Sequence, residues 1–99
     1  MRDALEQFLT ELAAQRRAST HTVAGYRRDI ARVLDLAGGA DRPVPRSAWT
    51  RELLERAFRD LYRRGQSSAS AARALAAWRT FSRFCARRGI VASDPARGL

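Results

Sequence analysis

Arginine spacing along one segment of the chain predicts anion binding. The sequence places Arg73, Arg79, Arg83 and Arg87 within a stretch, residues 61–93, that contains no Asp or Glu. At about 100° per residue, these guanidinium groups fall within an arc of roughly 120° on one helix. The solvent-exposed face of an ordinary helix in a soluble protein carries charges of both signs. The pattern therefore predicts a surface that binds phosphate groups.

Hydroxyls and small side chains come just before these arginines. Ser68, Ala69, Ala72 and Ala76 lie on or beside the arginine arc. Small side chains let a backbone approach a ligand closely, and a helix N-terminus presents free N–H groups and a positive dipole end to phosphate. The segment is suited to a helix that enters a nucleic-acid groove. The alternative is that the alanines only raise helix propensity.

A second segment, residues 20–37, repeats the pattern more weakly. Its outward face carries small and basic residues, with Arg27 at the flank: His21, Ala24, Gly25, Arg28 and Arg32. A glycine inside a helix costs about 1 kcal/mol relative to alanine. Gly25 is therefore explained either by contact with DNA or by close packing against another helix. His21 is either a DNA contact or a solvated residue at the start of the helix.

The sequence contains no motif for catalysis or metal binding. A single cysteine, Cys85, allows no internal disulfide, and one cysteine with one histidine cannot form a zinc site. There is no glycine-rich phosphate loop, and nothing places a nucleophile on a strained turn. We therefore expect no metal, no cofactor, no small-molecule substrate and no enzymatic activity in this chain.

The overall charge agrees with a polyanionic partner. The 99 residues include 19 basic side chains, all of them arginine, against 10 acidic ones, which gives a net charge of +9. A GC-rich genome explains arginine in place of lysine but not the excess of base over acid. Nucleic acid is the leading candidate. The main alternative is a helical protein–protein interaction module that binds an acidic partner.

Nothing in the sequence predicts secretion or membrane insertion. Residues 1–16 contain Asp3, Glu6 and Glu11, which a signal peptide would lack. No apolar run approaches the roughly 18 residues of a membrane span. A lone cysteine also fits a reducing compartment. We therefore expect a cytoplasmic protein with no membrane partner.

Four helices are predicted to position these side chains. Apolar residues recur at helical spacing over residues 3–16, 20–37, 51–64 and 67–88. Hydroxyl side chains suited to N-capping stand at the starts of the last three: Ser19, Thr50, and Ser67 or Ser68. Both tyrosines lie on apolar faces, so we expect Tyr26 and Tyr62 in the core. Four amphipathic helices can bury one another's apolar faces, which predicts an all-α, single-domain bundle.

The order of several motifs resembles a known family. The second helix carries Ser19, Thr22, Tyr26, Arg27, Arg28, Asp29 and Ile30, and the fourth carries Ser70, Arg73, Leu75, Ala77, Trp78, Arg79, Phe81 and Phe84, followed by Asp94-Pro95-Ala96. This resembles the N-terminal SAM-like, or core-binding, domain of Xer-type tyrosine recombinases of the phage-integrase family. Ala76, Trp78 and Asp94 replace the family's common Ser, Leu and Asn, which are changes of packing and capping. The resemblance covers nearly the whole chain and implies a four-helix, SAM-like orthogonal bundle.

The resemblance implies a role in site-specific DNA recombination. Residues 1–90 would form a DNA-binding domain that clamps a recombination half-site, and residues 91–99 would begin a linker to a catalytic domain that is absent here. The full-length protein would then cut and rejoin DNA in the bacterial nucleoid, whereas this chain would not. Its partners would be double-stranded DNA and other recombinase protomers, which the first helix would help to contact.

The resemblance and the arginine pattern together predict the DNA-binding residues. The second and fourth helices would cross the major groove of the DNA. The predicted contacts are His21, Thr22, Ala24, Gly25, Arg27, Arg28, Arg32, Ser68, Ser70, Arg73, Ala76, Arg79, Arg83 and Arg87. Guanidinium groups would capture the phosphate backbone, and base reading in the groove would be limited.

Overall fold

Helices account for most of the computed structural model, which describes residues 1–15, 18–39 and 41–99. The elements in chain order are α1 (Arg2–Ala13), α2 (Thr20–Gly38), the short 3₁₀ turn η1 (Arg46–Ala48), α3 (Arg51–Arg63) and α4 (Ser68–Arg87). Within the described residues there is no strand. The prediction of an all-α, four-helix bundle is confirmed.

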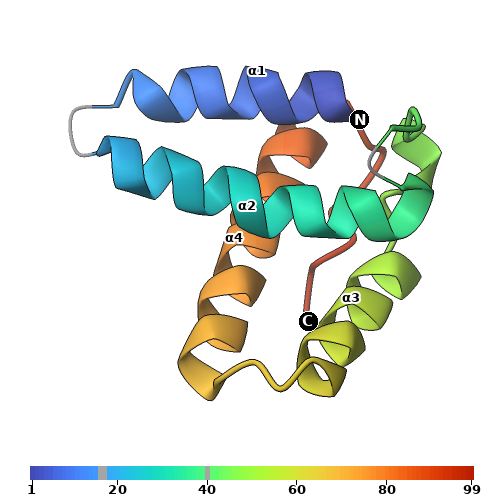
Figure 1. Ribbon diagram of the computed structural model, residues 1–99. Helices are drawn as coiled ribbons and strands as arrows, with labels where there is room; N and C mark the ends of the chain where they lie inside the picture. Colours follow the sequence, from blue (N-terminus) through green and yellow to red (C-terminus); the bar gives the residue numbers. More distant parts are fainter. Residues whose placement is uncertain (16–17, 40) are drawn as a thin grey trace.

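The helices cross rather than run side by side throughout. Helices α1 and α2 lie next to each other and run in opposite directions, while α4 crosses behind them at a steep angle (Figure 1). Helix α3 lies beneath the C-terminal end of α2, and the segment after α4 turns back between α4 and α3 (Figure 1). One side of α2 therefore overlooks both α3 and the N-terminal half of α4.

Local sequence signals fix where α2, α3 and α4 begin. The hydroxyls of Ser19, Thr50 and Ser67 each accept a hydrogen bond from the backbone N–H three residues later, at 3.1, 3.2 and 3.1 Å. These N-caps satisfy donors that have no partner within the helix. The predicted caps are therefore confirmed, with Ser67 rather than Ser68 before α4. Helix α1 ends at Ala13 instead of residue 16, and Arg16 and Arg17 lie outside the described residues.

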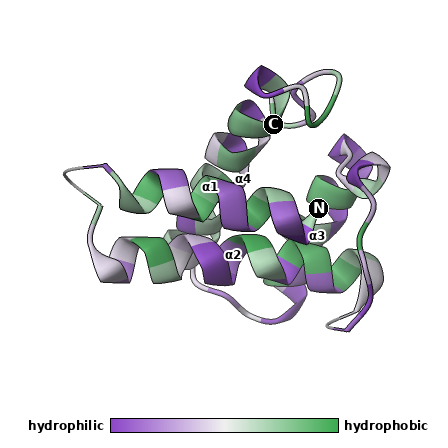
Figure 2. Ribbon diagram, turned by 90° about the horizontal axis from the view of Figure 1, so that it is seen from above, coloured by the Kyte–Doolittle hydropathy of each residue, from purple (hydrophilic) through white to green (hydrophobic). Residues whose placement is uncertain are grey.

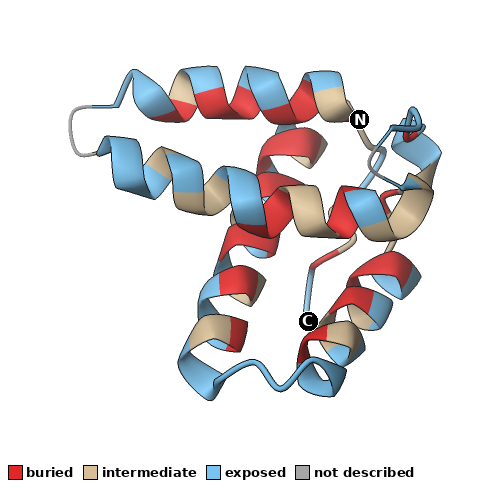
Figure 3. Cartoon of the chain, viewed as in Figure 1, coloured by how far each residue is buried: buried red, intermediate tan, exposed pale blue. Residues whose placement is uncertain are grey.

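Aromatic residues join three of the helices in the core. Phe8 of α1 packs edge-on against Tyr26 of α2 and against Phe81 and Phe84 of α4, with ring centroids 5.6, 5.4 and 5.3 Å apart. Trp78 and Phe81 are completely buried. Hydrophobic residues gather on the inner faces of the helices (Figure 2), and the same faces are buried (Figure 3). The apolar helical spacing noted over residues 3–16 corresponds to a buried stripe on α1, with Leu5, Phe8, Leu9 and Leu12.

Tyr62 contradicts the sequence-based expectation of a buried side chain, because it is 69% exposed. The buried stripe of α3 consists of Leu53, Leu54, Ala57 and Leu61. Tyr62 directly follows Leu61 and is therefore turned about 100° away from it. Its ring packs edge-on against the half-buried Phe58 with the centroids 5.3 Å apart. Tyrosine has an apolar ring and a polar hydroxyl, so helical spacing alone does not decide whether a tyrosine at the edge of an apolar stripe is buried.

Both buried indole N–H groups have hydrogen-bond partners. The indole N–H of Trp49 donates to the Ser82 hydroxyl at 2.9 Å, and the indole N–H of Trp78 donates to the backbone carbonyl of Asp29 at 2.8 Å. Burial raises the pKa of the Cys85 thiol to about 12, so this thiol stays protonated and unreactive. No described helix is both long and apolar enough to cross a membrane.

Candidate nucleic-acid interface

A hollow between α2 and α4 gathers residues that the sequence predicted as DNA contacts. It measures about 290 Å³. Its lining comes from one face of α2 and from the N-terminal half of α4: His21, Thr22, Gly25, Tyr26, Arg28, Asp29, Arg73, Ala76 and Ala77. We call it the α2–α4 hollow. The crossing of the two helices therefore brings basic, hydroxyl and small side chains to one concave surface.

A buried carboxylate holds one arginine at this hollow. The Asp29 side chain is only 3% exposed, and it accepts hydrogen bonds from Arg73 Nε at 3.2 Å and Arg73 Nη2 at 3.5 Å. The Arg73 side chain itself is 54% exposed. Arg28 Nε lies 3.8 Å from the same carboxylate. The pair leaves Arg73 Nη1 without a hydrogen-bond partner among the described residues while it fixes the plane of the guanidinium group.

Asp29 also connects α2 to α4 through its backbone. Its carbonyl oxygen accepts the Trp78 indole N–H, so side chain and main chain of one residue bind two residues of α4. Sequence reasoning did not identify this role. A signal was present, because Asp29 is the one acid on the stripe of α2 that Tyr26 and Val33 share. An acid on an apolar stripe needs a partner when it is buried.

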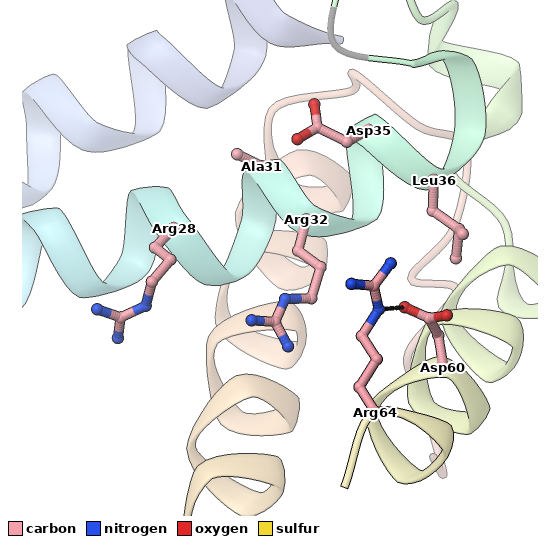
Figure 4. Close-up of a pocket in the computed structure, with 7 residues that line it drawn as sticks. All are labelled: Arg28, Ala31, Arg32, Asp35, Leu36, Asp60 and Arg64. Carbon is pink, nitrogen blue, oxygen red and sulfur yellow. Dashed lines mark hydrogen bonds and ion pairs between the residues drawn. The ribbon is translucent and has the colours of Figure 1, made fainter. Parts of the chain in front are cut away.

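A second hollow lies between α2 and α3, and we call it the α2–α3 hollow. It measures about 510 Å³ and is lined by Arg28, Ala31, Arg32, Asp35, Leu36, Asp60 and Arg64. Arg28 and Arg32 extend from the same side of α2, and Arg64 reaches from the end of α3 toward Arg32 (Figure 4). Arg28 lines both hollows, so the two form one surface, which we call the Arg28 surface.

Arg64 was not among the predicted contacts. It follows the last residue of α3, and its Nε donates to Asp60 Oδ2 at 2.8 Å. Its place beside Arg32 depends on how α3 packs beneath α2, which no local pattern shows. The available signal was weak, namely that Arg64 lies within the acid-free stretch 61–93.

The remaining arginines of the α4 arc lie next to the C-terminal segment. Arg83 and Arg87 line a separate hollow of about 540 Å³ together with residues 92–94 and Arg97. The guanidinium of Arg79 donates to the backbone carbonyl of Leu99. The arc is thus divided, with Arg73 beside α2 and the later arginines beside residues 92–99.

Arg27 is turned toward α1 and paired there. It forms a two-pronged ion pair with Glu6, with Nη2–Oε1 at 2.9 Å and Nη1–Oε2 at 2.5 Å. The hydrogen bonds from Arg27 lower the pKa of Glu6, and the same bonds raise the pKa of Arg27. The other acids of α1 are also paired, Glu11 with Arg88 and Asp3 with Arg46. Part of the net charge is therefore neutralised on this side of the bundle.

The small and hydroxyl residues of the predicted set are divided: Thr22, Gly25 and Ala76 line the α2–α4 hollow, and Ala24, Ser68 and Ser70 do not. Ala24 and Ser68 are exposed, and Ser70 is half-buried. The Ser70 N–H donates to the Ser67 hydroxyl at 3.1 Å, and the Ser67 hydroxyl donates to Ser70 Oγ at 3.0 Å. The Thr22 hydroxyl lies 3.0 Å from the Ser19 hydroxyl. Ser70 and Thr22 therefore take part in helix capping, in addition to any contact with a ligand.

The structure removes one explanation for Gly25. Among the described residues, a Cβ added at this position would meet only Arg28 Nη2 within 4 Å, at 3.8 Å. No atom of another helix comes within that distance, so close helix–helix packing does not require a glycine here. Among the described residues the helix surface at Gly25 is open toward the α2–α4 hollow.

Comparison with known proteins identifies the family. The family model described as the phage integrase N-terminal SAM-like domain matches residues 5–89, which include α2, α3 and α4 completely. The chain belongs to this family. The resemblance seen in the sequence motifs is thereby confirmed, and so is the SAM-like, all-α fold class. No solved structure matches the chain.

Relatives of the SAM-like domain include curated tyrosine recombinases. The chain is 41% identical over 99 residues to tyrosine recombinase XerC of Pseudomonas aeruginosa, with 100% of the chain and 32% of the relative covered. It is 37% identical over 106 residues to XerC of Pseudomonas fluorescens, covering 100% and 33%. It is 37% identical over 89 residues to XerC of Alcanivorax borkumensis, covering 90% and 28%. The chain therefore spans about a third of the length of these relatives.

Proposed function

We propose that this SAM-like domain binds double-stranded DNA through the Arg28 surface. Three parts of the chain bring arginines together around two adjoining hollows: Arg28 and Arg32 of α2, Arg64 at the end of α3, and Arg73 of α4. This cluster is the main support for the proposal. The lining carboxylates all have arginine partners: Asp29 with Arg73, Asp35 with Arg2, and Asp60 with Arg64. Arg28 shares Asp29 with Arg73, at 3.8 Å, and Arg32 has no ion-pair partner among the described residues. The surface therefore keeps an excess of positive charge, which favours a polyanion.

The mechanism begins with electrostatic capture of the phosphate backbone. Guanidinium groups bind phosphate oxygens and release counterions from the DNA. The small residues Gly25 and Ala76 then allow close approach, and His21 and Thr22 supply polar groups at the same hollow. Such a contact set gives tight positioning and limited reading of base edges.

The test of this proposal is the salt dependence of duplex binding, measured by fluorescence anisotropy. If about four phosphates are neutralised, the slope of log affinity against log salt is about −3.6, at about 0.9 per phosphate. A polyglutamate peptide at equal charge is the comparison ligand. Duplex binding with that slope supports the proposal. Binding to the acidic peptide without binding to duplex would instead support a module for an acidic protein partner.

We further propose that the domain acts within a site-specific tyrosine recombinase. The relatives are named tyrosine recombinases, and the chain spans about a third of their length. By this proposal, cutting and rejoining of DNA belong to a catalytic region outside these 99 residues. Other recombinase protomers would be partners in the same complex, with α1 as the contacting helix.

Replacement of Gly25 by alanine is expected to move stability and DNA affinity in opposite directions. Alanine has the higher helix propensity and meets no close atom, so the free energy of unfolding should rise by about 0.5–1 kcal/mol. The new methyl group lies at the α2–α4 hollow, so DNA affinity should fall. Urea denaturation and anisotropy measure the two effects. A variant that is more stable and binds as well as the wild type would show that DNA does not approach Gly25.

Replacement of Asp29 by asparagine is expected to weaken DNA binding although it removes a negative charge. Asp29 orients Arg73 from a buried position, so loss of the ion pair frees the guanidinium group to adopt other conformations. We expect a loss of about fivefold in affinity, equivalent to ~1 kcal/mol. Simple charge counting predicts the reverse. Anisotropy with Asp29→Asn, Arg73→Ala and the double variant checks this, because the two losses should not add.

A further inference from the structure

The α2–α3 hollow brings together like charges from two helices. Arg28 and Arg32 of α2 and Arg64 at the end of α3 all line it (Figure 4). Arg32 is half-buried. Among the described residues Arg32 has no carboxylate partner within ion-pair distance. Guanidinium groups that share a concave surface repel one another unless an anion lies between them.

Neither of the two carboxylates that line this hollow forms an ion pair with Arg32. Asp35 is directed away from Arg32 and Arg64 (Figure 4) and is bound to Arg2 at 3.1 Å. Asp60 binds Arg64 Nε at 2.8 Å and lies 3.4 Å from Arg63 Nη2. The bond through Nε holds the Arg64 guanidinium in place and leaves its terminal Nη groups to other acceptors.

We propose that the α2–α3 hollow binds a backbone phosphate of DNA, with Arg64 of α3 joining Arg28 and Arg32 as a donor. The inference rests on the proposed function and extends it, because it assigns α3 to the contact surface alongside α2 and α4. A phosphate would give Arg32 the anionic partner that it lacks among the described residues, and its oxygens accept the paired N–H groups of a guanidinium. The bound DNA would then pass from the α2–α4 hollow across Arg28 toward the end of α3.

The neighbouring residue Arg63 provides a matched control. Both Arg63 and Arg64 are exposed, with side chains 72% and 66% accessible, and both bind Asp60. Only Arg64 lines the α2–α3 hollow; Arg63 lines a different one with Arg56, Arg59 and Tyr62. Arg64→Gln and Arg63→Gln therefore remove the same charge and the same kind of ion pair, at positions that differ in access to the hollow.

The experiment compares duplex affinity of the wild type, Arg64→Gln and Arg63→Gln over a range of salt concentrations. Arg64→Gln is expected to reduce the magnitude of the salt slope by about 1 and the affinity by about tenfold near 0.1 M salt. Arg63→Gln is expected to leave the slope unchanged. Thermal unfolding of both variants establishes that they remain folded.

The outcomes separate this inference from the proposed function. Equal effects of the two substitutions, or none from either, would overturn the phosphate site while salt-dependent wild-type binding still supports DNA binding. Absence of salt-dependent duplex binding by the wild type would overturn the proposed function, and the phosphate site with it. Arg64→Lys keeps the positive charge but lacks the paired N–H donors of a planar guanidinium. A duplex affinity between those of the wild type and Arg64→Gln therefore supports recognition by a guanidinium.

Discussion

Replacement of Arg28 and Arg32 together by glutamate should lower the affinity for duplex DNA at least about a hundredfold near 0.1 M salt. Each arginine that contacts a phosphate contributes about a factor of ten at this salt concentration. Reversal of the charge adds repulsion to that loss. Arg28 lines both hollows and Arg32 lines one, so the two changes disrupt the whole Arg28 surface.

A matched charge reversal elsewhere controls for the change in net charge. Arg56 and Arg59 are exposed on α3 and line a hollow with Tyr62 and Arg63, apart from the Arg28 surface. Arg56→Glu with Arg59→Glu should reduce affinity far less than the Arg28 and Arg32 pair. Anisotropy titrations at one salt concentration measure both, with circular dichroism to check folding. Equal losses would mean that binding depends on net charge and not on a defined surface.

Replacement of Trp78 by alanine should destabilise the domain by about 3–5 kcal/mol. Trp78 is completely buried, and its indole N–H donates to the Asp29 carbonyl at 2.8 Å. Loss of the side chain leaves a cavity where α4 crosses α2. Because a domain of this size is stable by only about 5–15 kcal/mol in total, a large part of its stability would be lost. Urea denaturation monitored by far-UV circular dichroism gives the value.

Trp78→Phe separates packing from hydrogen bonding. Phenylalanine keeps most of the buried apolar volume but leaves the Asp29 carbonyl without its donor, at an expected penalty of about 1–3 kcal/mol. We therefore expect its stability to lie between those of the wild type and Trp78→Ala. A Trp78→Ala variant as stable as the wild type would contradict the central role assigned to this contact.

Helix positions were predictable because their signals are local. Ser19, Thr50 and Ser67 cap the helices that follow them, and apolar residues at helical spacing mark the buried faces. Tyr62 shows the limit of this reasoning. It lies at the edge of an apolar stripe, and only the packing of α3 against its neighbours decides that Leu61 is buried and Tyr62 exposed.

The candidate site was only partly predictable, because it depends on helix crossings. The spacing of Arg28, Arg32 and Arg73 on their own helices pointed to a basic face. The crossing of α2 over α4 then pairs Arg73 with Asp29, and the packing of α3 under α2 adds Arg64. Contacts between residues far apart in the sequence follow from tertiary structure, so helical spacing alone did not reveal them.

An NMR titration of ¹⁵N-labelled protein with duplex DNA locates the DNA-binding surface residue by residue. We expect amide shift changes to concentrate in His21–Arg32 of α2, Ser68–Ala76 of α4 and around Arg64, the residues at the Arg28 surface. Shift changes confined to α1 or to the outer face of α3 around Tyr62 would contradict DNA binding at this surface.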